Sequence, residues 1–169
     1  LGLLLRNDLN LFAYHLPLDV HPHYGNNAQL ARCLEITPQP PQIAGGIPGL
    51  LWHGELSEAA SLVEVAERLQ EKLGHKPIVV EAGTAPIRRI AWCSGGGQRF
   101  ITAAAALGVD AYFSGEISEP TAHEARELGV HYLAAGHHAT EQGGVQALGA
   151  HLAERFDISH RFIDDPNPA

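Results

Sequence analysis

A cluster of histidine and aspartate side chains lies near the start of the chain, where His15, Asp19, His21 and His23 occur within nine residues. Imidazole and carboxylate groups together suit Zn, Mn, Fe or Ni, whereas Mg and Ca prefer oxygen ligands alone. The two prolines of this segment stiffen it and favour an irregular loop. The pattern predicts metal binding, and the alternative interpretation is a polar surface loop that is rich in histidine.

A second cluster occurs about 120 residues later, in the segment Gly136–Glu141. His137 and Glu141 are four residues apart, so on a helix their side chains share one face and can chelate a single ion. The adjacent His138 points elsewhere, either toward the site from outside or into solvent. The helix dipole also favours a carboxylate in a first turn without any metal. Together the two clusters predict one shared site with Asp19, His137 and Glu141 as ligands.

A glycine-rich turn joins an expected strand to an expected helix at residues 93–98. The free amides of Gly95, Gly96 and Gly97 could bind a phosphate or a carboxylate at the helix start. The turn is neither a Walker loop nor a dinucleotide fingerprint, and tight strand-to-helix turns often use glycine for steric reasons alone. Glu116 follows the next strand and could direct a carboxylate to the same edge, although capping and solvation explain it equally well.

The elements that must position these residues alternate between strands and helices. A Ser61–Glu64 capping box and Gly74 bound one helix, and Ser118 and Gly129 bound another. Residues 38–48 form a Pro/Gly-rich connector. This alternation predicts an α/β fold with a largely covered sheet. The strands are expected at 10–14, 50–55, 77–81, 87–93, 109–114, 130–135 and 158–163, and the helices at 1–6, 28–34, 62–73, 98–107, 119–128 and 138–156.

Composition excludes several classes of protein. The 169 residues are 45% hydrophobic and 18% charged, which excludes a disordered or low-complexity chain. A net charge of −8 argues against nucleic acid as a partner. The apolar runs are too short to span a membrane. Cys33 and Cys93 form no C-x-x-C motif, which argues against a thiolate site and favours a reducing, cytoplasmic setting. The chain starts at Leu1 and has no methionine, so we expect a preceding segment.

Five sequence segments closely resemble the Nif-three-like family of dinuclear metal-binding proteins, whose bacterial members are often described as GTP cyclohydrolase I type 2. They are HLPLDVHPHYGNNAQLA, IAWCSGGGQRFI, GVDAYFSGEISEPTAHEARE, AAGHHATEQGG and FIDDPNPA. The resemblance implies two α/β/α lobes with mixed sheets, a site for two divalent metal ions between them, and a toroidal homohexamer. The implied division is 1–40 for the remainder of the first lobe, 41–136 for the second, and 137–169 for a C-terminal helix and strand that return to the first.

The resemblance also implies roles for single residues. Asp19, His137 and Glu141 match the metal ligands of the family, and His15 matches a close neighbour of the metals. The remaining ligands of the family come from a His-His-Gly motif, which does not occur before His15 in this sequence. We therefore expect this chain to carry only part of the dinuclear site.

Two functions remain open. The first is a metal-dependent hydrolase in which a metal-activated water opens a purine nucleotide ring. In it His15, His138 or Glu116 would move protons, and the Gly95–Gly97 turn would bind substrate phosphates. The second is a non-catalytic metal-binding protein that forms a hexameric assembly or binds a regulatory partner. An open coordination position would favour the enzyme, and a closed one would favour the assembly.

Overall fold

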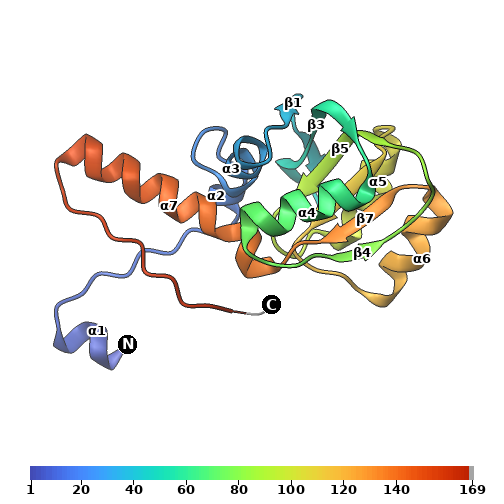
Figure 1. Ribbon diagram of the computed structural model, residues 1–169. Coiled ribbons are helices and arrows are strands. Elements are labelled where there is room, and N and C mark those ends of the chain that lie inside the picture. The colour runs from blue at the N-terminus through green and yellow to red at the C-terminus, as the bar shows by residue number, and fades with distance from the viewer. Residues whose placement is uncertain (168–169) are drawn as a thin grey trace.

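The computed structural model describes residues 1–167 and arranges them around one mixed sheet of seven strands (Figure 1). The strands are β1 (Thr37–Pro38), β2 (Gln42–Ala44), β3 (Ile47–Ala60), β4 (Ile78–Val80), β5 (Ile87–Cys93), β6 (Ala111–Ser114) and β7 (His131–Ala134). The helices are α1 (Gly2–Arg6), α2 (Leu16–Val20), α3 (Asn26–Cys33), α4 (Leu62–Leu73), the 3-10 turn η1 (Gln98–Phe100), α5 (Ile101–Ala106), α6 (Glu119–Leu128) and α7 (His137–Phe156).

The sheet has the strand order β1-β3-β5-β6-β7-β4, and β2 pairs with β3 outside this order. The strands β5, β6 and β7 run parallel, while β3 and β4 are antiparallel to their neighbours. In the parallel part, Cys93 pairs with Ser114, and Ser114 pairs with Ala134. The three strands therefore end level with one another, and the segments that follow them meet at one edge, where open α/β sheets usually bind ligands.

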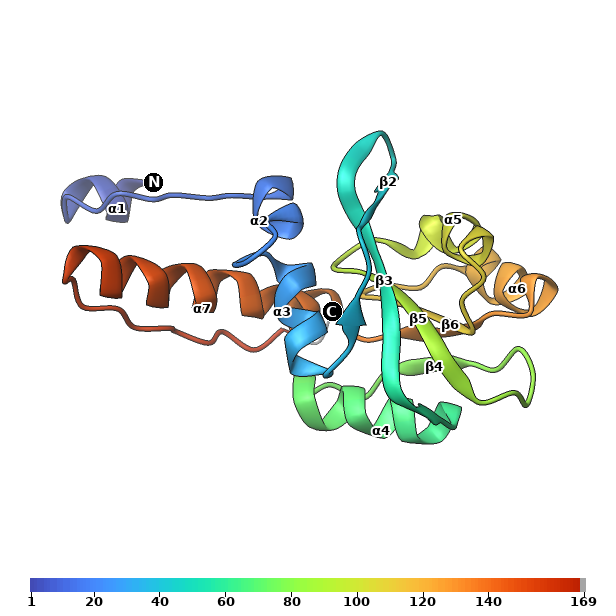
Figure 2. The ribbon, with the colours of Figure 1, turned by 90° about the horizontal axis from the view of Figure 1, so that it is seen from above.

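Helices cover both faces of this sheet (Figure 2). Because side chains alternate along a strand, Ile90 and Trp92 of β5 join the core under α3 and α4. Ala91 and Cys93 of the same strand join the core under α5 and α6. Trp92 is fully buried, as expected for a central strand that is covered on both faces.

The ends of α4 and α6 follow the sequence signals. Ser61 accepts a hydrogen bond from the amide of Glu64, and the Glu64 carboxylate accepts one from the amide of Ser61, which forms the expected capping box. Gly74 ends α4 in the left-handed conformation at φ 68°. Gly129 ends α6 in the same way, so these boundaries are confirmed.

Two strand predictions at the ends of the chain are wrong. Residues 10–14 and 158–163 form no strand, and both segments are exposed. Figures 1 and 2 show that these segments and most of α7 project away from the sheet. The amides and carbonyls of a strand need hydrogen-bond partners on a neighbouring strand. Within residues 1–167, neither segment lies beside such a strand.

Two irregular segments of the sequence analysis contain regular structure. The loop expected around Asp19 includes helix α2, in which Pro17 lies in the first turn, where no amide donor is needed. The connector at 38–48 forms part of a β-ribbon, because β1 and β2 both pair with β3 and the turn uses Gly45 and Gly46 at positive φ. Both segments were predicted to be irregular because they contain prolines. Pro17 is tolerated in the first turn of a helix, and Pro38 is tolerated in the edge strand β1.

The fold class is α/β with a mixed sheet. Residues 1–167 contain one sheet, and its strand β1 lies at Thr37–Pro38, just before the boundary that was expected at residue 40. The second lobe and a dinuclear site between two lobes stay predictions. Among the helices of residues 1–167, none is both long and apolar enough to cross a membrane.

Candidate metal centre

The predicted pair of His137 and Glu141 lies on the first turn of α7, at the sheet edge where the parallel strands β5, β6 and β7 end. His137 Nε2 is 3.3 Å from Glu141 Oε2. Two ligand atoms that bind one ion at about 2.1 Å lie about 3.0–3.4 Å apart at right-angled to tetrahedral geometry. The spacing of this pair therefore fits a shared divalent cation.

A second carboxylate approaches the other nitrogen of the same imidazole. Glu116 Oε1 lies 2.6 Å from His137 Nδ1, and Gln98 Nε2 donates to Glu116 Oε2 at 3.2 Å. The hydrogen bond with His137 holds the pKa of Glu116 below its ordinary value. Partial burial acts to lower the pKa of His137, but the hydrogen bond with Glu116 and the charge of Glu141 outweigh burial and raise it.

Asp19 reaches the same region from α2, more than 100 residues earlier in the chain. Its side chain is 4% exposed, and Oδ1 accepts hydrogen bonds from Asn26 Nδ2 at 2.8 Å and from Ser94 Oγ at 3.0 Å. Burial raises the pKa of Glu141, and the nearby charge of Asp19 raises it further. The structure thus places these two carboxylates close enough to repel each other, an arrangement that a bound cation would relieve.

Small residues make room for this approach. At Gly95, which has φ +61°, an added Cβ would lie 2.2 Å from Glu141 Oε1 and 2.9 Å from His137 Nε2. At Gly115 it would lie 2.6 Å from the Cα atom of His137. A Cβ at Gly115 would meet backbone atoms that cannot give way, and one at Gly95 would displace the Glu141 and His137 side chains, so the two turns after β5 and β6 are shaped around the start of α7.

The same turn offers little to an anion. The amide of Gly95 donates to Thr140 Oγ1 at 3.0 Å, and the amide of Gly97 donates to the Gly95 carbonyl at 2.9 Å. The carboxylates of Glu116 and Glu141 flank the turn. These contacts disfavour the predicted phosphate-binding role of the three glycines, which stays a prediction.

The two histidines predicted to move protons lie around the pair. His15 precedes α2 on the surface, and its charge is a minor influence that lowers the pKa of Glu141 against the raising effect of burial. His138 Nε2 is 3.5 Å from Asp164 Oδ1 in the C-terminal tail. A cavity of about 560 Å³ lies between the start of α7 and this tail, lined by His137, His138 and Glu141 among others.

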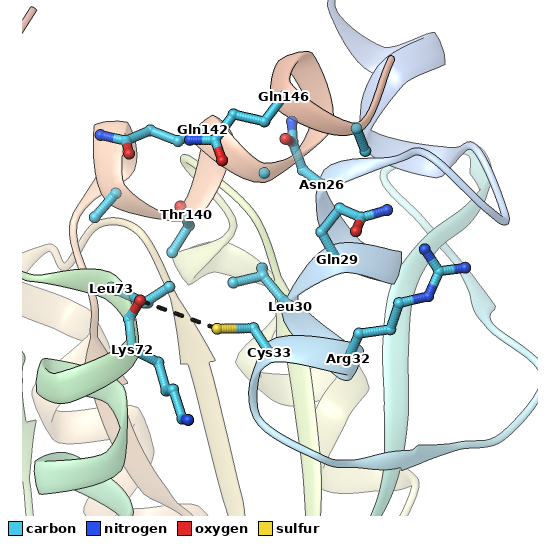
Figure 3. A pocket seen from close by; sticks show the side chains of 13 residues that line it. Asn26, Gln29, Leu30, Arg32, Cys33, Lys72, Leu73, Thr140, Gln142 and Gln146 are labelled. Carbon is cyan, nitrogen blue, oxygen red and sulfur yellow. Dashed lines mark hydrogen bonds between the residues drawn. The ribbon is translucent and has the colours of Figure 1, made fainter. Parts of the chain in front are cut away.

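A second cavity of about 520 Å³ lies between α3, the end of α4 and α7 (Figure 3). Its lining includes Asn26, which holds Asp19, and Thr140, which holds Gly95, but none of the three predicted ligands. The Cys33 thiol also lines it, and burial raises the pKa of that thiol. Burial raises the pKa of Cys93 to about 12, so neither cysteine is set up as a nucleophile.

The sequence analysis missed the residues that hold the ligands. Asn26, Ser94 and Thr140 each bond a ligand or the turn beneath it, and nothing in their local sequence pattern signals this role. Within residues 1–167, no three His, Cys, Asp or Glu side chains already stand together as a complete metal-binding group. The arrangement is therefore a pair of candidate ligands, His137 and Glu141, with the Asp19 carboxylate nearby.

Comparisons with known proteins agree on one family. Residues 1–168 match the family described as Duf34/NIF3 (NGG1p interacting factor 3). A protein of Pseudomonas aeruginosa named GTP cyclohydrolase 1 type 2 homolog is 54% identical over 166 residues, which cover 98% of this chain and 66% of that protein. The chain thus spans slightly less than two thirds of the length of this relative.

Solved structures give the same result. The structure titled protein ybgI, unknown function, superposes with a TM-score of 0.92 at 50% identity, covering 98% of this chain and 66% of that one. TTHA1606 from Thermus thermophilus superposes with a TM-score of 0.87 at 33% identity, covering 99% of this chain and 66% of that one. The fold described above is therefore shared along nearly the whole chain.

Proposed function

We propose, from the premise that the chain belongs to the Duf34/NIF3 family, that it contributes to a divalent-metal centre that hydrolyses a purine nucleotide ring. The observation that carries this proposal is the 3.3 Å approach of His137 Nε2 to Glu141 Oε2 beside the buried Asp19. Neutral imidazole and two carboxylates suit Zn, Mn, Fe or Ni. The name GTP cyclohydrolase 1 type 2 homolog, carried by relatives, supports the nucleotide.

We assign two roles to the residues of this site, metal binding and proton transfer. Asp19, His137 and Glu141 would contribute ligands to a metal site that binds two divalent ions when it is complete. A bound divalent metal lowers the pKa of a coordinated water, so that hydroxide is available near neutral pH. His15 and His138, at the rim of the pair, would move protons to and from the substrate.

The cavity beside the pair would hold the substrate. Its volume of about 560 Å³ lies within the range of small-molecule sites. Water addition at the C8 carbon of a purine opens the five-membered ring, and a second water releases that carbon as formate. The proposal includes a homohexamer, as the family resemblance implies, and a cytoplasmic setting, as the two unpaired cysteines suggest.

One observation favours a second function, a non-catalytic metal-binding assembly or regulatory protein. The amides of Gly95 and Gly97 are engaged and the carboxylates of Glu116 and Glu141 flank the turn, which disfavours the binding of nucleotide phosphates there. A closed metal site without a substrate position would suit a ring that metals only stabilise.

Elemental analysis combined with an assay for formate release from GTP tests the proposal. We expect the purified protein to contain divalent metal and release formate, and His137→Ala to lose both. His123→Ala, which removes an exposed histidine on α6, serves as the matched control and should keep both. Tight metal binding without hydrolysis of any purine nucleotide would instead support the assembly function.

A further inference from the structure

We infer that Glu116 is a positioning residue that fixes the ring orientation and the tautomer of His137, so that Nε2 faces Glu141. This inference rests on the proposed function of His137 as a metal ligand. It assigns Glu116 no contact with metal or substrate.

The two sides of the imidazole differ in their contacts. Nδ1 lies 2.6 Å from Glu116 Oε1, and Nε2 lies 3.3 Å from Glu141 Oε2. An ionised carboxylate only accepts hydrogen bonds, so the shorter contact requires a proton on Nδ1. In the neutral ring the lone pair then lies on Nε2, the nitrogen that points to Glu141. That is the tautomer a metal ligand needs.

Both the side chain and the backbone of Glu116 are held by hydrogen bonds. Its Oε2 accepts a hydrogen bond from Gln98 Nε2 at 3.2 Å, which orients the carboxylate. Its backbone carbonyl accepts hydrogen bonds from Ser114 Oγ at 3.1 Å and from Tyr132 Oη at 2.5 Å. The hydroxyl groups come from β6 and β7, so the backbone of Glu116 is fixed to the sheet edge. A carboxylate held in this way can orient the ring of His137.

A purely structural ion pair would behave differently. The side chains of His137 and Glu116 are 38% and 45% exposed, and ion pairs that are this exposed contribute little to stability. Loss of a hydrogen bond that orients a metal ligand typically weakens metal affinity by about 10–100-fold. The two roles therefore differ in what Glu116→Ala changes.

The first measurement is the tautomer of His137, read from its nitrogen-15 shifts in the metal-free protein at a pH where the ring is neutral. We expect the Nδ1–H form in the unsubstituted protein and a loss of that single form in Glu116→Ala. Glu119→Ala, which removes an exposed glutamate three residues away, is the matched control and should leave the tautomer unchanged.

The second measurement is the affinity for Zn²⁺ by calorimetric titration, with the melting temperature of each metal-free protein as a check on folding. We expect Glu116→Ala to bind about 10–100-fold more weakly than the unsubstituted protein and Glu119→Ala. An unchanged tautomer, or an unchanged affinity where the unsubstituted protein binds zinc, overturns the inference. Failure of the unsubstituted protein to bind zinc overturns the proposed function instead, and the tautomer still decides the role of Glu116.

Discussion

The sheet with the helices packed on it, here called the sheet body, differs sharply from the terminal segments 10–14 and 158–163 in how far its apolar side chains are buried. In the body, Trp92, Tyr112 and Leu133 are each 0% exposed. In the terminal segments, Phe12 is 77% exposed and Ile163 is also 77% exposed. The candidate ligands lie where these regions meet, and the contacts that orient them come from the body.

Helix α7 crosses from one region to the other. Its first turns contact the sheet edge and α3, where Thr140 is buried and the amide of Gly144 donates to Asn26 Oδ1 at 2.8 Å. Farther along, the stacking of His151 on Tyr24, with ring centroids 4.4 Å apart, is a contact with the segment that follows α2. His137 and Glu141 therefore lie in the part of α7 that contacts the sheet edge and α3, and not in the part that projects away from the sheet.

The largest expected effect is on stability and separates the two regions directly. Trp92→Ala removes a fully buried ring that stacks on Phe113 at 6.1 Å, and should cost about 3–5 kcal/mol of unfolding free energy. Phe12→Ala removes a ring of the exposed segment and should change stability by less than about 0.5 kcal/mol. Urea denaturation of both variants measures the contrast, and equal losses would show that the exposed segment is part of the same core.

The second effect is on metal affinity and tests whether the glycine turn shapes the site. Gly95→Ala places a Cβ 2.2 Å from Glu141 Oε1, so one of the two must move. We expect zinc affinity to fall about tenfold or more, measured by calorimetric titration. Gly96→Ala, in the same turn, meets its nearest atom at 3.6 Å and should leave the affinity unchanged.

Backbone strain needs a separate control, because Gly95 has φ +61°. Gly74→Ala carries the same kind of strain at φ +68° but has open space around the added Cβ. Both variants should lose about 1–2 kcal/mol of stability from the left-handed backbone. If Gly74→Ala weakened zinc binding as much as Gly95→Ala, the effect would come from lost stability and not from the turn.

The sequence predicted the sheet body better than the segments around it. The Ser61 and Gly74 signals gave both ends of α4, because helix capping depends on residues close in sequence. Residues 87–93 were expected as a strand and form β5, which has a neighbouring strand on each side. The strand expected at 10–14 failed because a strand depends on a neighbour that no local pattern reveals. The two-lobe division stays a prediction.

The candidate site divides in a similar way. His137 and Glu141 could be paired from the sequence, because helix periodicity places residues four apart on one face. Asp19 was included because its segment is rich in histidine, and its approach to Glu141 depends on how α2 packs. Ser94, Asn26 and the contact of Glu116 with His137 depend on three-dimensional proximity, so no spacing rule could identify them.

A smaller effect compares two glycines of α7. At Gly144 an added Cβ would lie 2.4 Å from Asn26 Oδ1, so Gly144→Ala should cost about 1–3 kcal/mol by disturbing the packing of α7 on α3. At Gly149 the obstacle is the His160 ring of the tail, which can swing away. Gly149→Ala should therefore stabilise α7 by up to about 1 kcal/mol through helix propensity. Thermal denaturation measures both, and a loss at Gly149 would show that the tail is firmly packed.

The smallest effect lies within the body, at the capped start of α4, and is a pH dependence. The backbone and hydroxyl hydrogen bonds from Ser61 hold the pKa of Glu64 below its ordinary value of 4.5. A carboxylate with a lowered folded-state pKa stabilises the protein above its unfolded pKa, and this contribution disappears as the pH falls through the folded pKa. The stability difference between the unsubstituted protein and Glu64→Gln should therefore be constant above pH 4.5 and shrink below it.

Urea denaturation at a series of pH values measures this difference, and the partner residue supplies the control. In a Ser61→Ala background the hydroxyl donor is gone while the backbone amide still donates, so the pH dependence of Glu64→Gln should become smaller but not vanish. A difference that stayed constant to low pH would mean that the charge of Glu64 does not contribute to the cap. The start of α7 has no such cap, because Gly136 has no side chain that could accept a hydrogen bond, and its first two turns are held instead by the contacts of Thr140 and Gly144.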